Sequence, residues 1–228
     1  MQRRLCALMP VLMVGLLVCP AAADFTVNVG QSTEPWLGYV NVFELPENGG
    51  AYVFGSAWGV PDLVANFDDP NNKVTFRATP IGTGDAFWYK NGTGGPGAEG
   101  NKLVEANLYI QMDDDALAGQ TMTFEGDVLS NTFVAGREAY IFIKDFAPDY
   151  SSFNQTIIPA VPGPFSISLG LDPGLGRHVQ YGFQNVGANV WPSDIALAGN
   201  VVYGTIPEPG ALALLAIGGL ALLRRRPA

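Results

Sequence analysis

Short runs of alternating apolar and polar residues constrain this chain more than any other feature of its sequence. Between residues 24 and 207, no stretch of ten or more residues has a clear helical periodicity. The alternation is instead that of strands with one buried face, and 28 Gly and 17 Pro supply turns between the runs. We therefore predict an all-β fold, a two-sheet antiparallel β-sandwich of about 10 to 12 strands. The clearest expected strands span residues 25–29, 39–43, 51–54, 73–77, 87–90, 103–112, 121–129, 138–146, 165–169, 178–183 and 200–203.

The alternation also predicts which side chains face the core. Within residues 103–112, the even-numbered apolar residues from Val104 to Ile110 share one face, which we assign to the core. Residues 138–146 form the most apolar run, and we expect this strand in the middle of a sheet. Residues 113–119 read as a turn or a single helical turn.

The last third of the expected sandwich has a recognisable order. An extended Phe-Ser-Ile-Ser-Leu run is followed by a Pro-Gly loop, a Val-Gln-Tyr-Gly-Phe-Gln-Asn-Val-Gly run, a Trp-Pro loop and a closing strand. This pattern over residues 165–203 resembles the end of jelly-roll carbohydrate-binding or galactose-binding-like domains. The resemblance implies a jelly-roll-like sandwich, and such domains often carry one structural Ca²⁺.

The N-terminal residues predict export. Arg3 and Arg4 form a basic region, an apolar stretch follows, and three Ala precede Asp24. This is the pattern of a signal peptide over residues 1–23, an N-terminal helix that signal peptidase removes. Both cysteines of the chain lie within it, so the expected single domain, residues 24–205, has neither a disulfide nor a thiolate site.

The C-terminal end consists of three consecutive parts. Residues 206–210 contain a Pro-Glu-Pro triplet, residues 211–223 are apolar without a charge, and residues 224–228 begin with three Arg. A helix over the apolar part would span roughly 20 Å, short of the ~30 Å hydrocarbon core, but its Leu and Ile content favours insertion. We therefore predict a transmembrane helix. By the positive-inside bias, the cytoplasmic anchor consists of Arg224, Arg225 and Arg226.

These three parts in this order resemble the PEP-CTERM sorting signal of exported bacterial proteins. The resemblance implies that an exosortase, a membrane transpeptidase, recognises Pro207, Glu208 and Pro209 and removes the helix. Family members often have Val before the first Pro, where this chain has Ile206. The alternative is an ordinary C-terminal anchor after a Pro-rich linker. The resemblance predicts a protein that is anchored in the membrane at first and then reaches the cell surface or the extracellular matrix.

The net charge of the exported part restricts the classes of partner that it can bind. All 21 acidic residues lie between Asp24 and Glu208, but five of the 12 basic residues lie in the two ends, which leaves a net charge of −14. Such a charge argues against binding to nucleic acid or anionic lipid. It is compatible with divalent cations and with neutral glycans.

Catalytic residues are sparse. His178 is the only histidine, no carboxylate lies near it in sequence to orient it, and we expect a solvent-facing strand residue. No G-x-S-x-G motif occurs. A pair of carboxylates suited to glycoside hydrolysis needs a separation that the fold sets, and the 21 acidic residues make such a pair possible by chance. We predict no enzymatic activity.

Two acidic loops are candidates for a structural Ca²⁺ site. Asp68, Asp69 and Asn71 offer hard oxygen ligands in one loop, and residues 113–115 are three Asp in another. Neither has the EF-hand spacing, and both also suit metal-free turns. We expect no cofactor other than this Ca²⁺.

Four tryptophans are candidates for stacking on sugar rings. Trp58 and Trp191 adjoin Gly59 and Pro192, so we expect them at strand ends or loops, and alternation places Trp88 opposite its neighbours. Trp36 is the fourth candidate. Tryptophans in a sandwich are more often core or interface residues, and this alternative applies to all four. Two functions therefore stay open, a structural or adhesive surface protein and a module that binds extracellular polysaccharide. An exposed aromatic platform favours the second, and four buried tryptophans favour the first.

Overall fold

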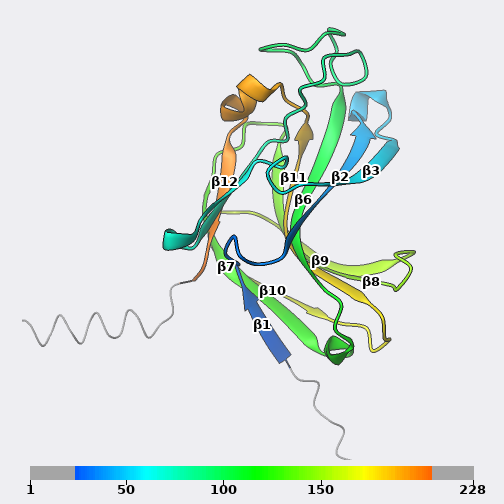
Figure 1. Cartoon of the computed structure of the whole chain (residues 1–228), viewed down its shortest axis with the longest axis vertical. Helices are drawn as coiled ribbons and strands as arrows, with labels where there is room; N and C mark the ends of the chain where they lie inside the picture. Colours follow the sequence, from blue (N-terminus) through cyan, green and yellow to red (C-terminus); the bar gives the residue numbers. More distant parts are fainter. Residues whose placement is uncertain (1–23, 207–228) are drawn as a thin grey trace, which may run out of the picture.

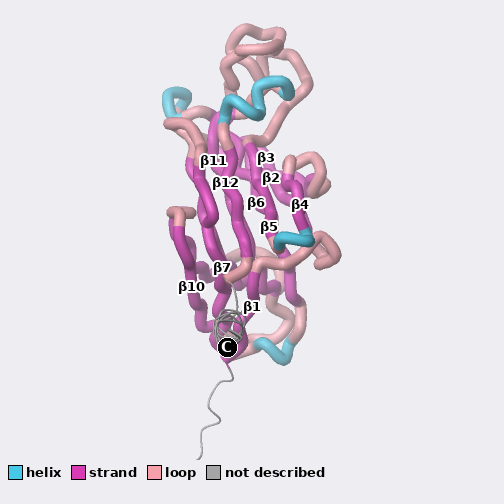
Figure 2. Tube along the Cα trace, turned by 90° about the vertical axis from the view of Figure 1, so that its left-hand side faces the viewer, coloured by secondary structure: helices cyan, strands magenta, loops and turns pink. Residues whose placement is uncertain are grey.

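The computed structural model describes residues 24–206, which form two six-stranded sheets packed face to face (Figure 1). The strands are β1 (Asp24–Asn28), β2 (Trp36–Glu44), β3 (Tyr52–Trp58), β4 (Ala65–Asp68), β5 (Lys73–Arg77), β6 (Lys102–Met112), β7 (Thr121–Asn131), β8 (Glu138–Phe146), β9 (Phe153–Pro159), β10 (Gly163–Gly170), β11 (His178–Ala188) and β12 (Asn200–Gly204). Four 3-10 helices lie between strand ends (Figure 2): η1 (Pro46–Asn48), η2 (Asp69–Asn71), η3 (Asp115–Leu117) and η4 (Pro192–Ala198). The predicted all-β, two-sheet sandwich is confirmed.

The second sheet has the order β3-β2-β6-β11-β8-β9. In the first sheet, β10 pairs with one edge of β7, while β1 and then β12 pair with the other edge, and β5 and β4 follow β12. The last eight strands pair in a nested order, β5 with β12, β6 with β11, β7 with β10 and β8 with β9. The chain therefore folds back on itself as one long antiparallel ribbon that is divided between the two sheets.

The prediction of purely antiparallel sheets is wrong at one position. β1 runs parallel to β7, with Asp24 opposite Thr121 (Figure 1). A hairpin forces two strands to be antiparallel, but β1 and β7 are separated by five other strands. No local turn therefore fixes the direction of β1.

Residues 87–90 are also not a strand. They form a turn with a single bridge from Tyr89 to Gly100, because the Asp85 carboxylate accepts hydrogen bonds from the backbone N–H groups of Phe87 and Trp88, both at 3.0 Å. This Asx turn competes with the strand that alternation alone predicts. Conversely, β4 and β9 are strands that alternation did not reveal.

The core lies between the two sheets. Phe124, Phe183 and Tyr203 are fully buried there, and the rings of Phe183 and Tyr203 stack at 3.7 Å. The even-numbered residues from Val104 to Ile110 are buried in the same cluster, which confirms the predicted core face of this strand. We expected residues 138–146 in the middle of a sheet. In the structure this strand, β8, lies next to the edge strand β9, and the two middle positions of the sheet belong to β6 and β11.

The predicted signal helix (1–23), the Pro-Glu-Pro triplet, the transmembrane helix (211–223) and the cytoplasmic Arg residues lie outside the described residues. Within residues 24–206, no helix is long and apolar enough to cross a membrane.

Candidate functional site

The outer face of the second sheet is hollowed to a volume of about 630 Å³, within the usual range for small-molecule sites. We call this hollow the outer groove. β6, β11 and β8 form its floor, and β2 and β9 its sides. It is lined by Tyr39, Asn41, Glu105, Asn107, Tyr109, Gln111, Lys144, Phe146, Tyr150, Phe153, Gln155, Ile157, Gln180 and Gln184.

Strand register brings the polar residues of the groove together. Because alternate residues of a strand share a face, the odd-numbered residues of β6 and the even-numbered residues of β11 and β8 point outward. One row across the sheet reads Gln111, Gln180, Lys144 and Gln155. Four strands, β6, β11, β8 and β9, thus contribute one continuous line of hydrogen-bonding groups.

The next row contains a glycine at its centre. Gly182 lies between Tyr109 of β6 and Phe142 of β8. A Cβ atom added to Gly182 would lie 2.2 Å from the carbonyl oxygen of Leu108, so no larger residue fits. The absence of a side chain here lets the backbone of β11 lie close to that of β6.

A hydrogen-bond network holds the amides of the floor. Asn107 is its hub, because its Oδ1 accepts from Gln184 Nε2 at 2.9 Å and its Nδ2 donates to Glu105 Oε1 at 3.3 Å. Asn41 Nδ2 donates to the same Glu105 oxygen at 2.8 Å. Asn107 and Gln184 are each 5% exposed, so these side chains are fixed rather than free in solvent. A fixed array of donors and acceptors suits a ligand rich in hydroxyl groups.

Lys144 is the one basic residue among those that line the outer groove, and it is 9% exposed. Its Nζ lies 3.4 Å from Asn107 Oδ1 and 4.4 Å from the centre of the Phe142 ring. Burial lowers the pKa of Lys144, and the nearby charge of Glu105 opposes this change.

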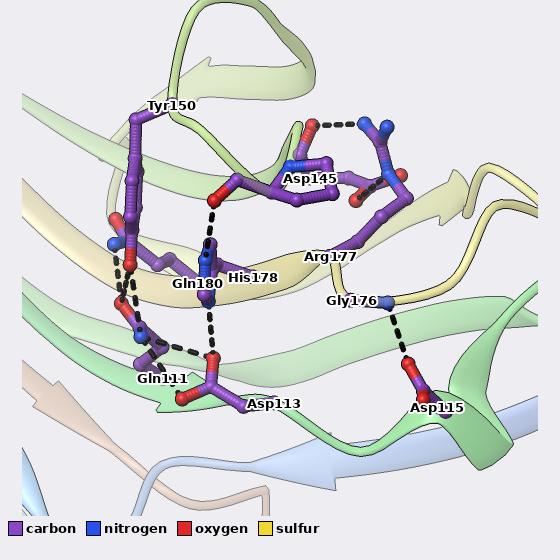
Figure 3. Close-up of polar contacts among 10 residues, drawn as sticks. Gln111, Asp113, Asp115, Asp145, Tyr150, Gly176, Arg177, His178 and Gln180 are labelled. Carbon is purple, nitrogen blue, oxygen red and sulfur yellow. Dashed lines mark hydrogen bonds and ion pairs between the residues drawn. The ribbon is translucent and has the colours of Figure 1, made fainter.

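Aromatic side chains form the rim at one end of the groove. Tyr150 and Phe153 are 49% and 48% exposed, and both rings pack on Phe146, at 5.5 and 5.0 Å. Tyr150 also stacks flat on His178 at 4.3 Å, and Gln111 Nε2 donates to the Tyr150 hydroxyl at 3.2 Å (Figure 3). These contacts hold an exposed aromatic platform beside the polar floor.

His178 lies on the outer face of β11, as expected, but only 21% of its side chain is exposed because protein groups contact both ring nitrogens. Its Nδ1 lies 2.8 Å from Asp113 Oδ1, and its Nε2 lies 3.3 Å from the carbonyl oxygen of Pro148 (Figure 3). The carboxylate that sequence proximity did not reveal therefore comes from a turn 65 residues away. Because both ring nitrogens have protein partners, His178 ties two loops together and supports the platform.

A second polar cluster lies beyond this end of the groove. The buried Asp145 carboxylate pairs with Arg177 Nε at 2.6 Å (Figure 3). It also accepts a hydrogen bond from the backbone N–H of Asp172 at 2.8 Å. Asp115 accepts from the backbone N–H of Gly176 at 2.6 Å. These contacts fix the loop that leads into β11 and thereby the position of His178.

The tryptophans predicted for sugar stacking lie elsewhere. Trp36 is 8% exposed in the core. Trp58 and Trp88 are half-buried against the core, and Trp191 packs on Tyr89 with ring centres 5.5 Å apart. None of the four lines the outer groove, whose exposed aromatic residues are Tyr and Phe instead.

The two loops predicted for Ca²⁺ are held by protein contacts. Asp69 accepts from the Ser32 N–H and hydroxyl at 2.8 and 2.5 Å, which lowers its pKa, and Asp68 accepts from Asn71 at 2.8 Å. Asp114 accepts from the Ala116 N–H at 2.9 Å. Within residues 24–206 no group of three or more His, Cys, Asp and Glu is arranged to hold a metal ion.

Sequence reasoning located four of the five strands of the groove, all but β9, and did not reveal the groove itself. It placed Glu105, Asn107 and Tyr109 on the face of β6 opposite the core, where the structure has them. The missing information was strand order, because β8 and β11 become neighbours only through long-range pairing. The unusual density of Gln and Asn on predicted outer faces was the available signal.

The comparisons with known proteins concern the C-terminal end. Residues 205–226 match the PEP-CTERM protein-sorting motif, as the sequence predicted. The motif is the recognition signal for exosortase processing and identifies an exported protein that is membrane-associated at first. No curated protein and no solved structure gives a significant match to this chain.

Proposed function

We propose that this exported protein, whose residues 205–226 are a PEP-CTERM protein-sorting motif, is a non-catalytic adhesion protein that binds saccharides in its outer groove. Exosortase processing would release it from its membrane anchor to the cell surface or the extracellular matrix. One observation carries the proposal: an ordered floor of amides lies beside an exposed aromatic platform in a single groove.

The chemistry of saccharides matches both parts of the groove. Sugar hydroxyls donate and accept hydrogen bonds, and the amides of Gln111, Gln180 and Gln184 do the same. The flat apolar face of a sugar ring can cover an aromatic ring such as Phe153. The nested pairing of β5 to β12 supports a jelly-roll-like sandwich, as the sequence pattern implied, but this likeness concerns the fold and carries no function by itself.

Titration of the full chain in detergent with a panel of oligosaccharides tests the binding. We expect Phe153→Ala to weaken the affinity about two- to tenfold, which corresponds to about 0.5–1.5 kcal/mol for an aromatic contact. Ser166→Ala, on the outer face of the first sheet, is the matched control and should leave the affinity unchanged. Equal affinity of both variants would contradict a site in the groove.

The absence of catalysis and the processing are tested separately. Incubation with the bound oligosaccharides should return them unchanged, and any shortened product would contradict the proposal. The intact mass of the protein recovered from its own cells should correspond to a chain that ends near Pro207 to Pro209. A mass that corresponds to a chain through Ala228 would make the tail a permanent anchor.

A further inference from the structure

The two buried lysines of the described chain differ in their partners. Lys102 is 4% exposed, and its Nζ lies 3.0 Å from Glu44 Oε2 and 3.3 Å from the carbonyl oxygen of Asn101. Lys144 is 9% exposed, and its one hydrogen bond, to Asn107 Oδ1, is 3.4 Å long. Within residues 24–206, no carboxylate oxygen lies within 4.0 Å of Lys144 Nζ. A buried ammonium group is normally paired, so Lys144 lacks the partner that its environment calls for.

The position of Lys144 shows where that partner would come from. Lys144 belongs to the row Gln111, Gln180, Lys144 and Gln155 on the floor of the outer groove. An ammonium group carries three N–H donors, and the protein uses one of them weakly. The remaining donors can be satisfied from within the groove, by a ligand.

The surroundings of Lys144 favour a ligand with a single negative charge. Lys144 is the one basic residue among those that line the groove, and Glu105 is the one acidic residue. Glu105 is already engaged by Asn41 and Asn107, and its charge would repel a doubly charged phosphate monoester more than a carboxylate. A carboxylate matches both the charge and the hydrogen-bonding capacity of one ammonium group.

We infer that the saccharide bound in the outer groove contains a uronic acid, whose carboxylate pairs with Lys144. This inference rests on the proposed saccharide binding and adds the class of sugar. The flanking amides of Gln180 and Gln155 would bind hydroxyl groups on either side of the carboxylate.

The negative charge of the exported part does not prevent such binding. Its net charge is −14, but repulsion between exposed charges is largely screened beyond the Debye length of about 8 Å at physiological ionic strength. The contact with Lys144 is buried, so salt screens it much less. Uronate binding should therefore weaken only slightly as salt is raised, in contrast to the binding of a polyanion by a basic surface.

The test compares two ligands that differ only in the carboxylate. An oligogalacturonate and the same oligomer with its carboxyl groups reduced to alcohols are titrated into the full chain in detergent. We expect the acidic oligomer to bind at least about tenfold more tightly, a difference of about 1.4 kcal/mol. Lys144→Met should bind both oligomers equally, and Lys73→Met, at an exposed lysine of the first sheet, should keep the preference.

The outcomes separate this inference from the proposed function. Equal binding of both oligomers to the unaltered protein would overturn the role of the carboxylate and leave saccharide binding intact. A preference that persists in Lys144→Met would overturn the role of Lys144. Failure of every oligosaccharide to bind would overturn the proposed function and this inference together. The comparison of the two ligands needs no variant, so it stands even if Lys144→Met does not fold.

Discussion

The outer faces of the two sheets arise from the same alternation of residues, yet they differ in kind. On the first sheet, short side chains interact in exposed pairs, such as Thr123 with Ser168 at 2.8 Å and Ser166 with Glu125 at 2.9 Å. On the second sheet, Asn107, Gln184 and Lys144 are at most 9% exposed and meet in one network, although they lie outside the core. The first face is an ordinary solvated surface. The second buries polar groups in fixed positions, which is what the proposed binding of saccharides requires.

The largest expected difference between the two sheets concerns glycine. Gly182→Ala would place a Cβ 2.2 Å from the Leu108 carbonyl oxygen, whereas a Cβ on Gly170 of β10 would meet nothing within 4 Å. We expect Gly182→Ala to lower the free energy of unfolding by about 3 kcal/mol or more, and Gly170→Ala to leave it unchanged or raise it slightly. Urea denaturation measures both. Equal effects would mean that the second sheet tolerates a side chain at its centre.

The next difference concerns polar side chains. Asn107→Ala removes the hub of the network and leaves Gln184 Nε2 and Lys144 Nζ without the hydrogen-bond acceptor they share, so we expect a loss of about 1–3 kcal/mol in the free energy of unfolding. Thr123→Ala, which removes one exposed hydrogen bond of the first sheet, should cost less than about 0.5 kcal/mol. Similar losses in both variants would show that the second face is as solvated as the first.

Two buried tyrosines test how much a hydrogen-bond partner contributes to the free energy of unfolding. The Tyr203 hydroxyl has no hydrogen-bond partner within residues 24–206, and burial raises its pKa. The Tyr89 hydroxyl, equally buried, hydrogen-bonds to the Val190 carbonyl oxygen at 2.9 Å. We expect Tyr203→Phe to raise the free energy of unfolding by about 1 kcal/mol and Tyr89→Phe to lower it by about as much. A loss of stability in Tyr203→Phe would indicate a buried water bound to the hydroxyl.

The smallest expected effect concerns pH at the rim of the groove. Partial burial alone would raise the pKa of Asp113. Hydrogen bonds from His178 and Gln111 outweigh this effect and hold the pKa below its ordinary value of 3.8. The ionised carboxylate therefore stabilises the fold above this value, and the contribution is lost as the pH falls through the lower folded pKa. Because Asp113 is half exposed, we expect less than about 1 kcal/mol.

Asp113→Asn should thus reduce the dependence of unfolding on pH below about pH 4. Thermal unfolding between pH 2 and pH 7 measures this dependence. An unchanged acid limb would mean that the contact with His178 contributes nothing to stability.

Alternation predicted most strands because burial of one face needs only a local pattern. It failed at residues 87–90, where the Asp85 side chain binds two backbone N–H groups and makes a turn. It also missed β9, whose residues become a strand by pairing with β8. For the groove, it assigned Asn107 to the outer face but had no information on which strand lies beside β6.

The class of fold, the core face of β6 and the sorting motif could all be predicted from the sequence, because each depends on residues that are close together in the chain. Three features arise only in the folded protein: the parallel direction of β1, the pairing of His178 with Asp113 and the row that joins Gln111, Gln180, Lys144 and Gln155. They could not be predicted because strand order follows from burial summed over the whole sandwich. A local pattern sets the face on which a residue lies, but long-range pairing sets its neighbours.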